Sequence, residues 1–407
     1  MPVLADPSNI SRRMSLSAVV QAIASYSPIS RASVSKITGL SKQTVSEIVG
    51  NLEEEGWVRT VGQTEGHVGR RAVVYEIVPE AASVASVDLG GTKIRVAICN
   101  LTGAVVSELV EPTDKAGGKA VIDQVADLIR RTAAQAGTTA KLPRVAVIGV
   151  PGAPDRETGN IRMAPNIPGI GELDAPALWR DALGIEVFVE NDVNLAALGE
   201  HWLTKRSDKD DLIYVSIGTG IGAGIVIGGQ LHRGLNGAAG EIGYLPFGAD
   251  PFEPESLETG ALERVAATHA ITELYARKTG RSLDVPAIFE AANDGDTAAS
   301  ETLDQTARQA ARVMAALAAV LDPSCIVIGG SIGARYELFS RVENQLKACF
   351  PRPVLIEKST LGNHAALAGG ASVALSRLHL SLFTEGLKGV EIAVPPPSIE
   401  TFRKGAA

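Results

Sequence analysis

The sequence contains few cysteines, and it lacks an export segment and a long apolar run. Cys99, Cys325 and Cys349 lie far apart among 407 residues, without the paired spacing of metal sites. We expect reduced packing residues in a cytoplasmic protein. The polar N-terminus, with Asp6 ahead of two arginines, lacks the apolar core of a signal peptide. No uninterrupted apolar run is long enough for a bilayer-spanning helix, so we expect no membrane partner.

Length, composition and charge distribution indicate a globular protein with one distinct end. A chain of 407 residues predicts two or three domains, and 45% hydrophobic residues are ample for buried cores. Residues 1–79 hold eight Lys or Arg and seven Asp or Glu, a balance of +1, so the overall −8 leaves −9 for the remainder. Only the first domain therefore has a charge balance that a polyanion would tolerate.

Residues 1–79 show the spacing of a helix-turn-helix. Apolar residues at helical intervals predict a first helix ending at Tyr26, and Val34 and Ile37 are expected to face inward from a second, 31–38. Gly39 then makes a turn, and Ser41 is well placed to cap a third helix. This helix would bury Val45, Ile48, Val49 and Leu52. Its outward polar residues, Lys42, Gln43, Thr44 and Ser46, are the expected contacts to bases and phosphates.

A polar ribbon, residues 59–78, follows the third helix. A ribbon in this position is typical of a wing, and Arg70 and Arg71 at its tip suit phosphate or minor-groove contact. We therefore expect a winged helix-turn-helix that binds operator DNA. The alternative is a three-helix protein-interaction module with a solvated charged loop.

Two stretches share one design of apolar strand, glycine-threonine turn and apolar strand. The first, residues 84–99, contains Asp88, Gly90, Gly91, Thr92 and Lys93. The second, residues 212–227, contains Gly218, Thr219 and Gly220. Glycines at such turns let backbone amides approach an anion, so each turn is a candidate phosphate loop. Two copies predict two similar lobes facing across a cleft. Two unrelated hairpins with ordinary glycine turns are the alternative.

Further strands and helices alternate along the chain, which indicates an α/β fold. Residues 121–129 carry the apolar stripe of a helix covering a sheet, and residues 145–150 form a buried strand. A strand from Val187 runs into a polar loop and a helix. A long helix then precedes the strand 325–328, which ends in the Gly329-Gly330 turn.

These motifs together resemble the ROK family of repressors, open reading frames and sugar kinases. The resemblance covers about residues 11–380, and the N-terminal winged helix resembles the family's regulators. It implies an actin-like, hexokinase-like ATPase fold with lobes at 80–200 and 201–380, and residues 381–407 are expected to form an extended, mobile tail. The matching segments are Asp88-Leu-Gly-Gly-Thr-Lys93, Pro165-Asn166, Glu190-Asn191-Asp192, Gly218-Thr-Gly-Ile-Gly222, Ala239-Gly-Glu-Ile-Gly243, Leu257-Glu-Thr259 and Gly329-Gly330.

The resemblance also implies site residues. In the related kinases the aspartate matching Asp192 takes the proton from the attacking sugar hydroxyl, a general-base role. Asp88 would orient Mg²⁺, and the glycine turns with Lys93 would hold the phosphates of ATP. The sugar would be hydrogen-bonded by Asn166, Asn191, Asp192, Glu241, Tyr244 and Glu258. Taken alone, each of these residues is equally typical of a loop turn or a helix cap.

The chain departs from the family pattern where the family binds zinc. Tyr244 stands where family members usually have a histidine that also touches the sugar. The three cysteine positions of the family's knot fall on Ala249, Pro251 and Ser256. Since all four ligands are missing, we predict no structural zinc. Tyr244 also leaves the identity of the sugar open.

The sequence thus predicts a sugar-responsive transcriptional regulator, most simply a repressor. A sugar or sugar phosphate in the cleft would change lobe closure and DNA affinity. We expect at least a homodimer, because paired recognition helices must meet half-sites one helical turn apart. An active ATP-dependent sugar kinase, alone or combined with DNA binding, is the main alternative, and a protein-interaction scaffold with an inactive cleft is a third.

Overall fold

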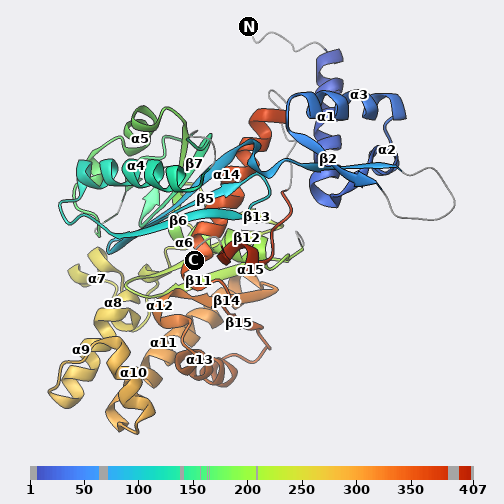
Figure 1. The fold of residues 1–407 in the computed structure, drawn as a ribbon. Helices are drawn as coiled ribbons and strands as arrows, with labels where there is room; N and C mark the ends of the chain where they lie inside the picture. Colours follow the sequence, from blue (N-terminus) through green and yellow to red (C-terminus); the bar gives the residue numbers. More distant parts are fainter. Residues whose placement is uncertain are drawn as a thin grey trace. The chain divides into compact units, whose positions relative to one another are not determined.

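The computed structural model describes residues 7–63, 72–137, 142–155, 157–162, 164, 166–207, 210–383 and 394–404 (Figure 1). The chain forms two compact units, and each collects segments that are distant in sequence. Unit 1 comprises Met1–Val150, Gly159–Val189 and Gly370–Ala407. Unit 2 comprises Pro151–Thr158 and Glu190–Gly369.

Unit 1 begins with three helices and a small antiparallel sheet of order β1-β3-β2. Ser30 and Ser41 cap the second and third helices by accepting hydrogen bonds from the backbone N–H groups of Ser33 and Thr44. The predicted inward face of the third helix is confirmed, because all four of its apolar residues are buried. Ile37, expected inward, is instead 50% exposed. The elements are α1 (Pro7–Tyr26), β1 (Ile29–Ser30), α2 (Arg31–Thr38), α3 (Lys42–Glu54), β2 (Val58–Gln63) and β3 (Val73–Ile77).

The main sheet of unit 1 has the order β10-β7-β4-β5-β6. β4, β5 and β6 form an antiparallel meander, while β7 lies parallel to β4. Helices α4 and α5 pack on this sheet and bury Trp179, whose indole N–H donates to Ile122 O at 3.1 Å. The elements are β4 (Ser83–Leu89), β5 (Lys93–Asn100), β6 (Val105–Pro112), α4 (Gly118–Gln135), β7 (Val145–Val150), β9 (Ile161–Arg162), α5 (Ala175–Leu183) and β10 (Glu186–Asn191).

Unit 2 is built on a second five-stranded sheet of order β13-β12-β11-β14-β15. β11 pairs antiparallel with β12 and parallel with β14, so both units repeat a hairpin next to a parallel strand. Its strands are β8 (Ala153–Pro154), β11 (Leu212–Ile217), β12 (Ile221–Ile227), β13 (Gln230–Leu231), β14 (Cys325–Gly329) and β15 (Ile356–Lys358). Its helices are α6 (Asp192–Leu203), α7 (Pro254–Thr259), α8 (Glu263–Ala266), α9 (Thr268–Thr279), α10 (Val285–Asn293), α11 (Thr297–Leu321), α12 (Gly330–Gly333) and α13 (Tyr336–Cys349).

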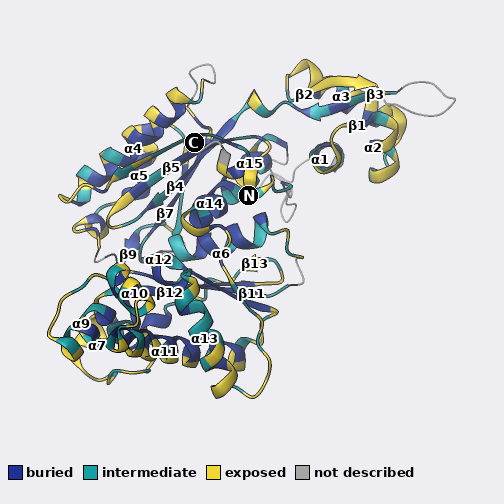
Figure 2. Cartoon of the chain, turned by 60° about the horizontal axis from the view of Figure 1, so that its bottom comes forward, coloured by how far each residue is buried: buried dark blue, intermediate teal, exposed yellow. Residues whose placement is uncertain are grey.

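Burial follows these layers. The inner strands of both sheets are largely dark blue in Figure 2, whereas β2 of the wing is exposed after Val58. Of the three cysteines, Cys99 and Cys325 are buried as expected, and burial raises the pKa of each thiol to about 12. Cys349, at the end of α13, is exposed, so the prediction that it serves in packing is wrong.

The C-terminal segments return to unit 1. Helix α14 (Ala365–Phe383) begins in unit 2 and ends in unit 1, where Phe383 meets Trp57 edge-on with ring centroids 5.7 Å apart. The expected extended tail contains α15 (Ile399–Lys404), which contacts β6 and leaves Phe402 only 1% exposed. An extended segment was expected because three prolines precede this helix, but burial of Phe402 holds the helix against unit 1.

One stretch in the described part of the chain, Gly362–Phe383, is long and apolar enough to cross a membrane by length and composition alone. This differs from the expectation that no run reaches that length. Its most apolar window is 61% buried inside the protein, as in a core helix.

Candidate functional site

The predicted DNA-contacting residues lie at the start of α3. Lys42, Gln43 and Ser46 are exposed, and the Thr44 hydroxyl lies 2.9 Å from the capping hydroxyl of Ser41. Lys42 and Gln43 therefore carry side chains suited to base and phosphate contact, whereas Thr44 mainly stabilises the helix start.

Arg31 is a residue of this face that sequence reasoning missed. Its guanidinium donates to Ser46 Oγ at 3.1 Å, lies 3.7 Å from a Glu53 carboxylate oxygen and covers the Tyr75 ring at 4.9 Å. The cation thus joins α2, α3 and β3 and fixes the orientation of Ser46. Its position at the start of α2 gives no sign of these contacts.

The wing arginines Arg70 and Arg71 lie outside the described residues. The stem of the ribbon, β2 and β3, is described, and there Arg59 pairs with Glu76 at 2.8 Å and with Glu80 at 3.5 Å. The charge of Arg59 is therefore balanced within the domain.

The first glycine turn, Gly90 to Thr92, joins β4 to β5 in unit 1. Gly90 N donates to Lys93 O at 2.9 Å, and Gly90 O accepts a hydrogen bond from Thr113 Oγ1 at 2.6 Å. A Cβ on Gly91 would lie 2.8 Å from the Asn166 Cβ, so glycine is required for this approach. The turn therefore brings Asn166 beside Gly91, while Thr92 and Lys93 are exposed and Asp88 is half-buried on β4.

The second glycine turn, Gly218 to Gly220, joins β11 to β12 in unit 2. Gly218 O accepts hydrogen bonds from Thr268 N at 3.0 Å and from Thr268 Oγ1 at 2.9 Å. Gly330, at φ +82°, begins α12 beside this turn, where a Cβ would lie 2.4 Å from Ile217 O. Gly329, which ends β14, and Gly330 thus lie beside the second turn in unit 2.

The Glu190-Asn191-Asp192 segment forms a connected polar group at the start of α6. Asn191 caps this helix through Oδ1 and donates from Nδ2 to Gly152 O at 2.9 Å. Glu190 accepts hydrogen bonds from Asn194 Nδ2 at 3.0 Å and from Arg233 Nε at 2.6 Å. Asp192 follows, half-buried, with Oδ1 accepting from Val193 N at 2.9 Å. The arrangement holds the Asp192 carboxylate at a helix N-terminus, where the helix dipole favours a negative charge.

Asn194 and Arg233 are two members of this group that the motifs did not single out. Asn194 lies one turn beyond the capping Asn191, a spacing that indicates a shared face of α6. Arg233 lies in the loop after β13, 43 positions from Glu190, and nothing local predicts their ion pair.

Three other predicted sugar contacts lie in a second group of unit 2. Glu241 is half-buried, and Tyr244, 39% exposed, donates from its hydroxyl to Glu258 O at 3.1 Å. The Glu258 side chain is exposed, so its backbone carbonyl is the part engaged here. Glu263, which the sequence did not single out, belongs to this group, because its Oε2 would lie 3.3 Å from a Cβ added at Gly243, between Glu241 and Tyr244.

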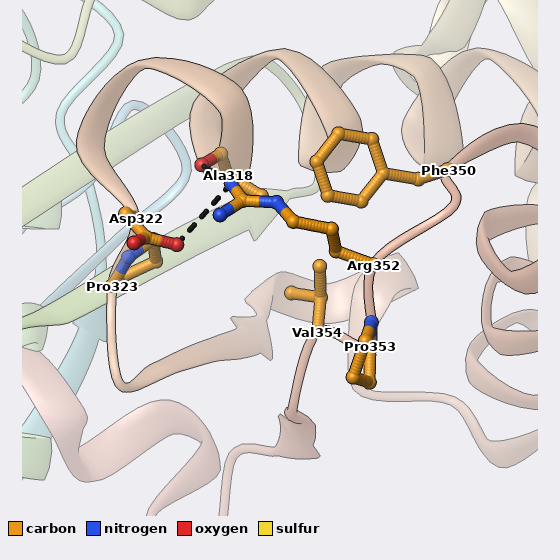
Figure 3. Close-up of a pocket in the computed structure, with 7 residues that line it drawn as sticks. All are labelled: Ala318, Asp322, Pro323, Phe350, Arg352, Pro353 and Val354. Carbon is orange, nitrogen blue, oxygen red and sulfur yellow. Dashed lines mark hydrogen bonds and ion pairs between the residues drawn. The ribbon is translucent and has the colours of Figure 1, made fainter.

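The described residues also line two surface hollows, which contain none of the predicted site residues. One, of about 270 Å³ in unit 2, lies where Arg352 reaches Asp322 at 3.3 Å and stacks on Phe350 (Figure 3). The other, of about 570 Å³ in unit 1, includes Arg144 and Arg180. Among the described residues no three His, Cys, Asp or Glu side chains gather as metal ligands would. The absence of zinc remains a prediction.

Comparison with known proteins identifies the family. The family model of the ROK family matches residues 84–377, and a model for winged helix-turn-helix DNA-binding domains matches residues 17–59. A putative xylose repressor of Caldicellulosiruptor sp. (strain Rt8B.4) is 28% identical over 88% of this chain and 94% of its own length. A glucokinase of Halalkalibacterium halodurans is 31% identical over 70% of this chain and 92% of its own length.

A solved structure shows the same fold over nearly the whole chain. It is a ROK family transcriptional regulator, described as a homolog of the E. coli MLC protein, and it superposes with a TM-score of 0.73 at 24% identity, over 92% of this chain and 98% of that one. The α/β fold with an N-terminal winged helix, predicted from the sequence, is therefore confirmed. The chain belongs to the ROK family, in its DNA-binding regulator form with a winged helix-turn-helix ahead of the family domain.

Proposed function

We propose that this chain is a sugar-responsive transcriptional repressor. One observation carries the proposal: a single chain presents Lys42 and Gln43 from a capped recognition helix and also holds carboxylate and amide side chains at the start of α6. The first arrangement suits operator DNA and the second suits the hydroxyls of a polyol. Repressor relatives of nearly the same length support the combination.

The sugar contacts are proposed to centre on Asp192 and Asn191. The Asn191 amide is held by the α6 cap and by Gly152 O, and the Asp192 carboxylate accepts from Val193 N, so little ordering remains for a ligand to impose. Glu241, Tyr244 and Glu258, with Asn166 of unit 1, are the further contacts proposed from the family resemblance. Xylose, named in one relative's description, is the first sugar to test.

The regulator is proposed to act in the cytoplasm as a homodimer or a larger homo-oligomer. Two copies of α3 must meet half-sites about one helical turn apart on the operator, which a single winged helix cannot do. A sugar that prefers one conformation of the family domain would then change operator affinity by a coupling of about 1–3 kcal/mol.

The test is operator binding measured with and without sugars. In vitro selection with the full chain defines a DNA site, and fluorescence anisotropy on that site then gives the affinity. Lys42→Ala combined with Gln43→Ala should weaken binding at least about tenfold, because phosphate and base contacts are lost together. Asp192→Asn should retain DNA affinity and lose the sugar response, while Asp123→Asn on the exposed face of α4 serves as the matched control.

Two results would reject the proposal. The first is a selection in which the wild-type chain enriches no DNA sequence. The three helices would then be interpreted as a protein-interaction module. Alternatively, no sugar or sugar phosphate of a broad panel would change either operator affinity or melting temperature.

A sugar kinase is the second candidate, because the family resemblance gives Asp192 a general-base role and a glucokinase is among the relatives. Phosphoryl transfer would additionally need ATP at the glycine turns and Mg²⁺ near Asp88. A coupled ATP assay over hexoses, N-acetylhexosamines and pentoses tests it. Equal rates for wild type and Asp192→Asn would reject kinase activity.

A further inference from the structure

The second glycine turn is contacted by a carboxylate of this chain. Glu263, the first residue of α8, directs Oε2 to the turn and accepts a hydrogen bond from Ile221 N at 2.8 Å. A Cβ on Gly220 would lie 2.9 Å from the same oxygen, so the carboxylate lies directly against the glycine backbone. It occupies the kind of position beside the turn that a bound phosphate oxygen would need.

Other polar groups of the turn are also engaged within the protein. Gly218 N donates to Gly220 O at 3.0 Å, while Gly218 O accepts both hydrogen bonds from Thr268. The amides of Gly218 and Ile221 therefore already have acceptors. A phosphate arriving here would have to displace the carboxylate to reach Ile221 N, and its negative charge would be repelled while doing so.

The surroundings of Glu263 add negative charge. Burial raises the pKa of the Glu263 carboxyl, and the charge of half-buried Glu241 raises it further. In the described part of the chain no Lys, Arg or His forms an ion pair with either carboxylate. A nucleotide phosphate needs the opposite charge at such a turn, supplied by a lysine, an arginine or a metal ion.

We propose that Glu263 is an internal ligand of the second glycine turn and excludes the phosphates of ATP from it. The chain then binds its effector without a nucleotide. An uncharged sugar is compatible with the two carboxylates, because hydroxyl groups donate hydrogen bonds to them. The inference does not depend on which sugar is bound or on whether the effector proposal holds.

The test measures binding of AMP-PNP with Mg²⁺ to the full chain by isothermal titration calorimetry. Glu263→Gln removes the charge with little change in size, and Glu263→Ala removes the carboxylate. The matched control is Glu273→Gln, an exposed glutamate on α9 whose only described ion pair is with His269. Competition by inorganic tripolyphosphate shows whether the phosphates, rather than adenine, are recognised.

We expect wild type and Glu273→Gln to bind AMP-PNP at least about tenfold more weakly than the two Glu263 variants. Wild-type binding as tight as that of the variants would overturn the proposal, since Glu263 would then be harmless or would ligate Mg²⁺. A folded Glu263→Gln with no gain in affinity would overturn it as well. If Glu263→Ala does not fold, the AMP-PNP affinities of wild type and Glu263→Gln alone test the proposal. Sugar-induced melting shifts, measured in parallel, report on the effector proposal separately.

Discussion

The two glycine turns share a sequence pattern and a hairpin but differ in what lies against them. In each, the first glycine's carbonyl accepts a hydrogen bond from a threonine hydroxyl, Thr113 at 2.6 Å in unit 1 and Thr268 at 2.9 Å in unit 2. The first turn leaves Thr92 and Lys93 exposed, whereas the second is contacted by the Glu263 carboxylate.

A glycine-threonine turn in the sequence therefore predicts a hairpin with room for an anion. The same pattern does not determine whether an anion binds there. That depends on a side chain 42 positions away in sequence. A fold inherited with phosphate-binding turns can therefore keep both hairpins while one turn holds a carboxylate of the same chain.

Among substitutions near the second turn, Gly330→Ala should cause the largest loss of stability. Its Cβ would lie 2.4 Å from Ile217 O at φ +82°, so the substitution combines backbone strain with a clash at the end of β11. We expect a loss of about 3 kcal/mol or more in the free energy of unfolding, measured by urea denaturation.

Gly280→Ala is its control, because Gly280 has φ +72° with nothing within 4 Å of the added Cβ. It isolates the strain, and we expect about 1–2 kcal/mol. Equal losses for the two variants would mean that the packing of Gly330 against β11 contributes nothing.

The two threonines should respond unequally to removal of the hydroxyl. Thr113→Val removes the side-chain hydrogen bond to Gly90 O, and we expect a loss of about 1 kcal/mol. Thr268→Val should cost about half as much, because Gly218 O keeps the hydrogen bond from Thr268 N at 3.0 Å. Urea denaturation of both variants checks the order. If Thr268→Val is the more destabilising, the backbone hydrogen bond does not compensate as proposed.

The smallest predicted effect is on the pH dependence of stability, and it arises from Glu263 at the second turn. Burial and the Glu241 charge raise the pKa of Glu263 in the folded protein, so the folded state binds more protons than the unfolded state above pH of about 4.3. The contribution of Glu263 to the free energy of unfolding should therefore fall as pH rises from that value through the raised pKa. Glu263→Gln, which does not titrate, should flatten this fall by less than about 1 kcal/mol. Identical pH profiles for the two proteins would contradict the assignment.

The local parts of this structure could be predicted from the sequence. Serine caps, helical spacing and strand-glycine-strand patterns involve neighbouring residues, so the winged helix and both hairpins could be placed in advance. The burial of Ile37 was predicted wrongly, because the apolar spacing of a short helix does not show which of its apolar residues contacts the core. The Glu190–Arg233 and Glu263–Ile221 contacts join residues about forty positions apart, and no local rule specifies them.

Most of helix α14 and the segment with Phe402 lie within Gly370–Ala407, which follows unit 2 in the chain and yet belongs to unit 1. During synthesis, the unit that leaves the ribosome first is therefore the last to be finished. Strand β6, for example, lacks its contact with α15 until the last described residues have been synthesised. A truncated gene product that ends at Gly369 would contain all of unit 2 and an incomplete unit 1.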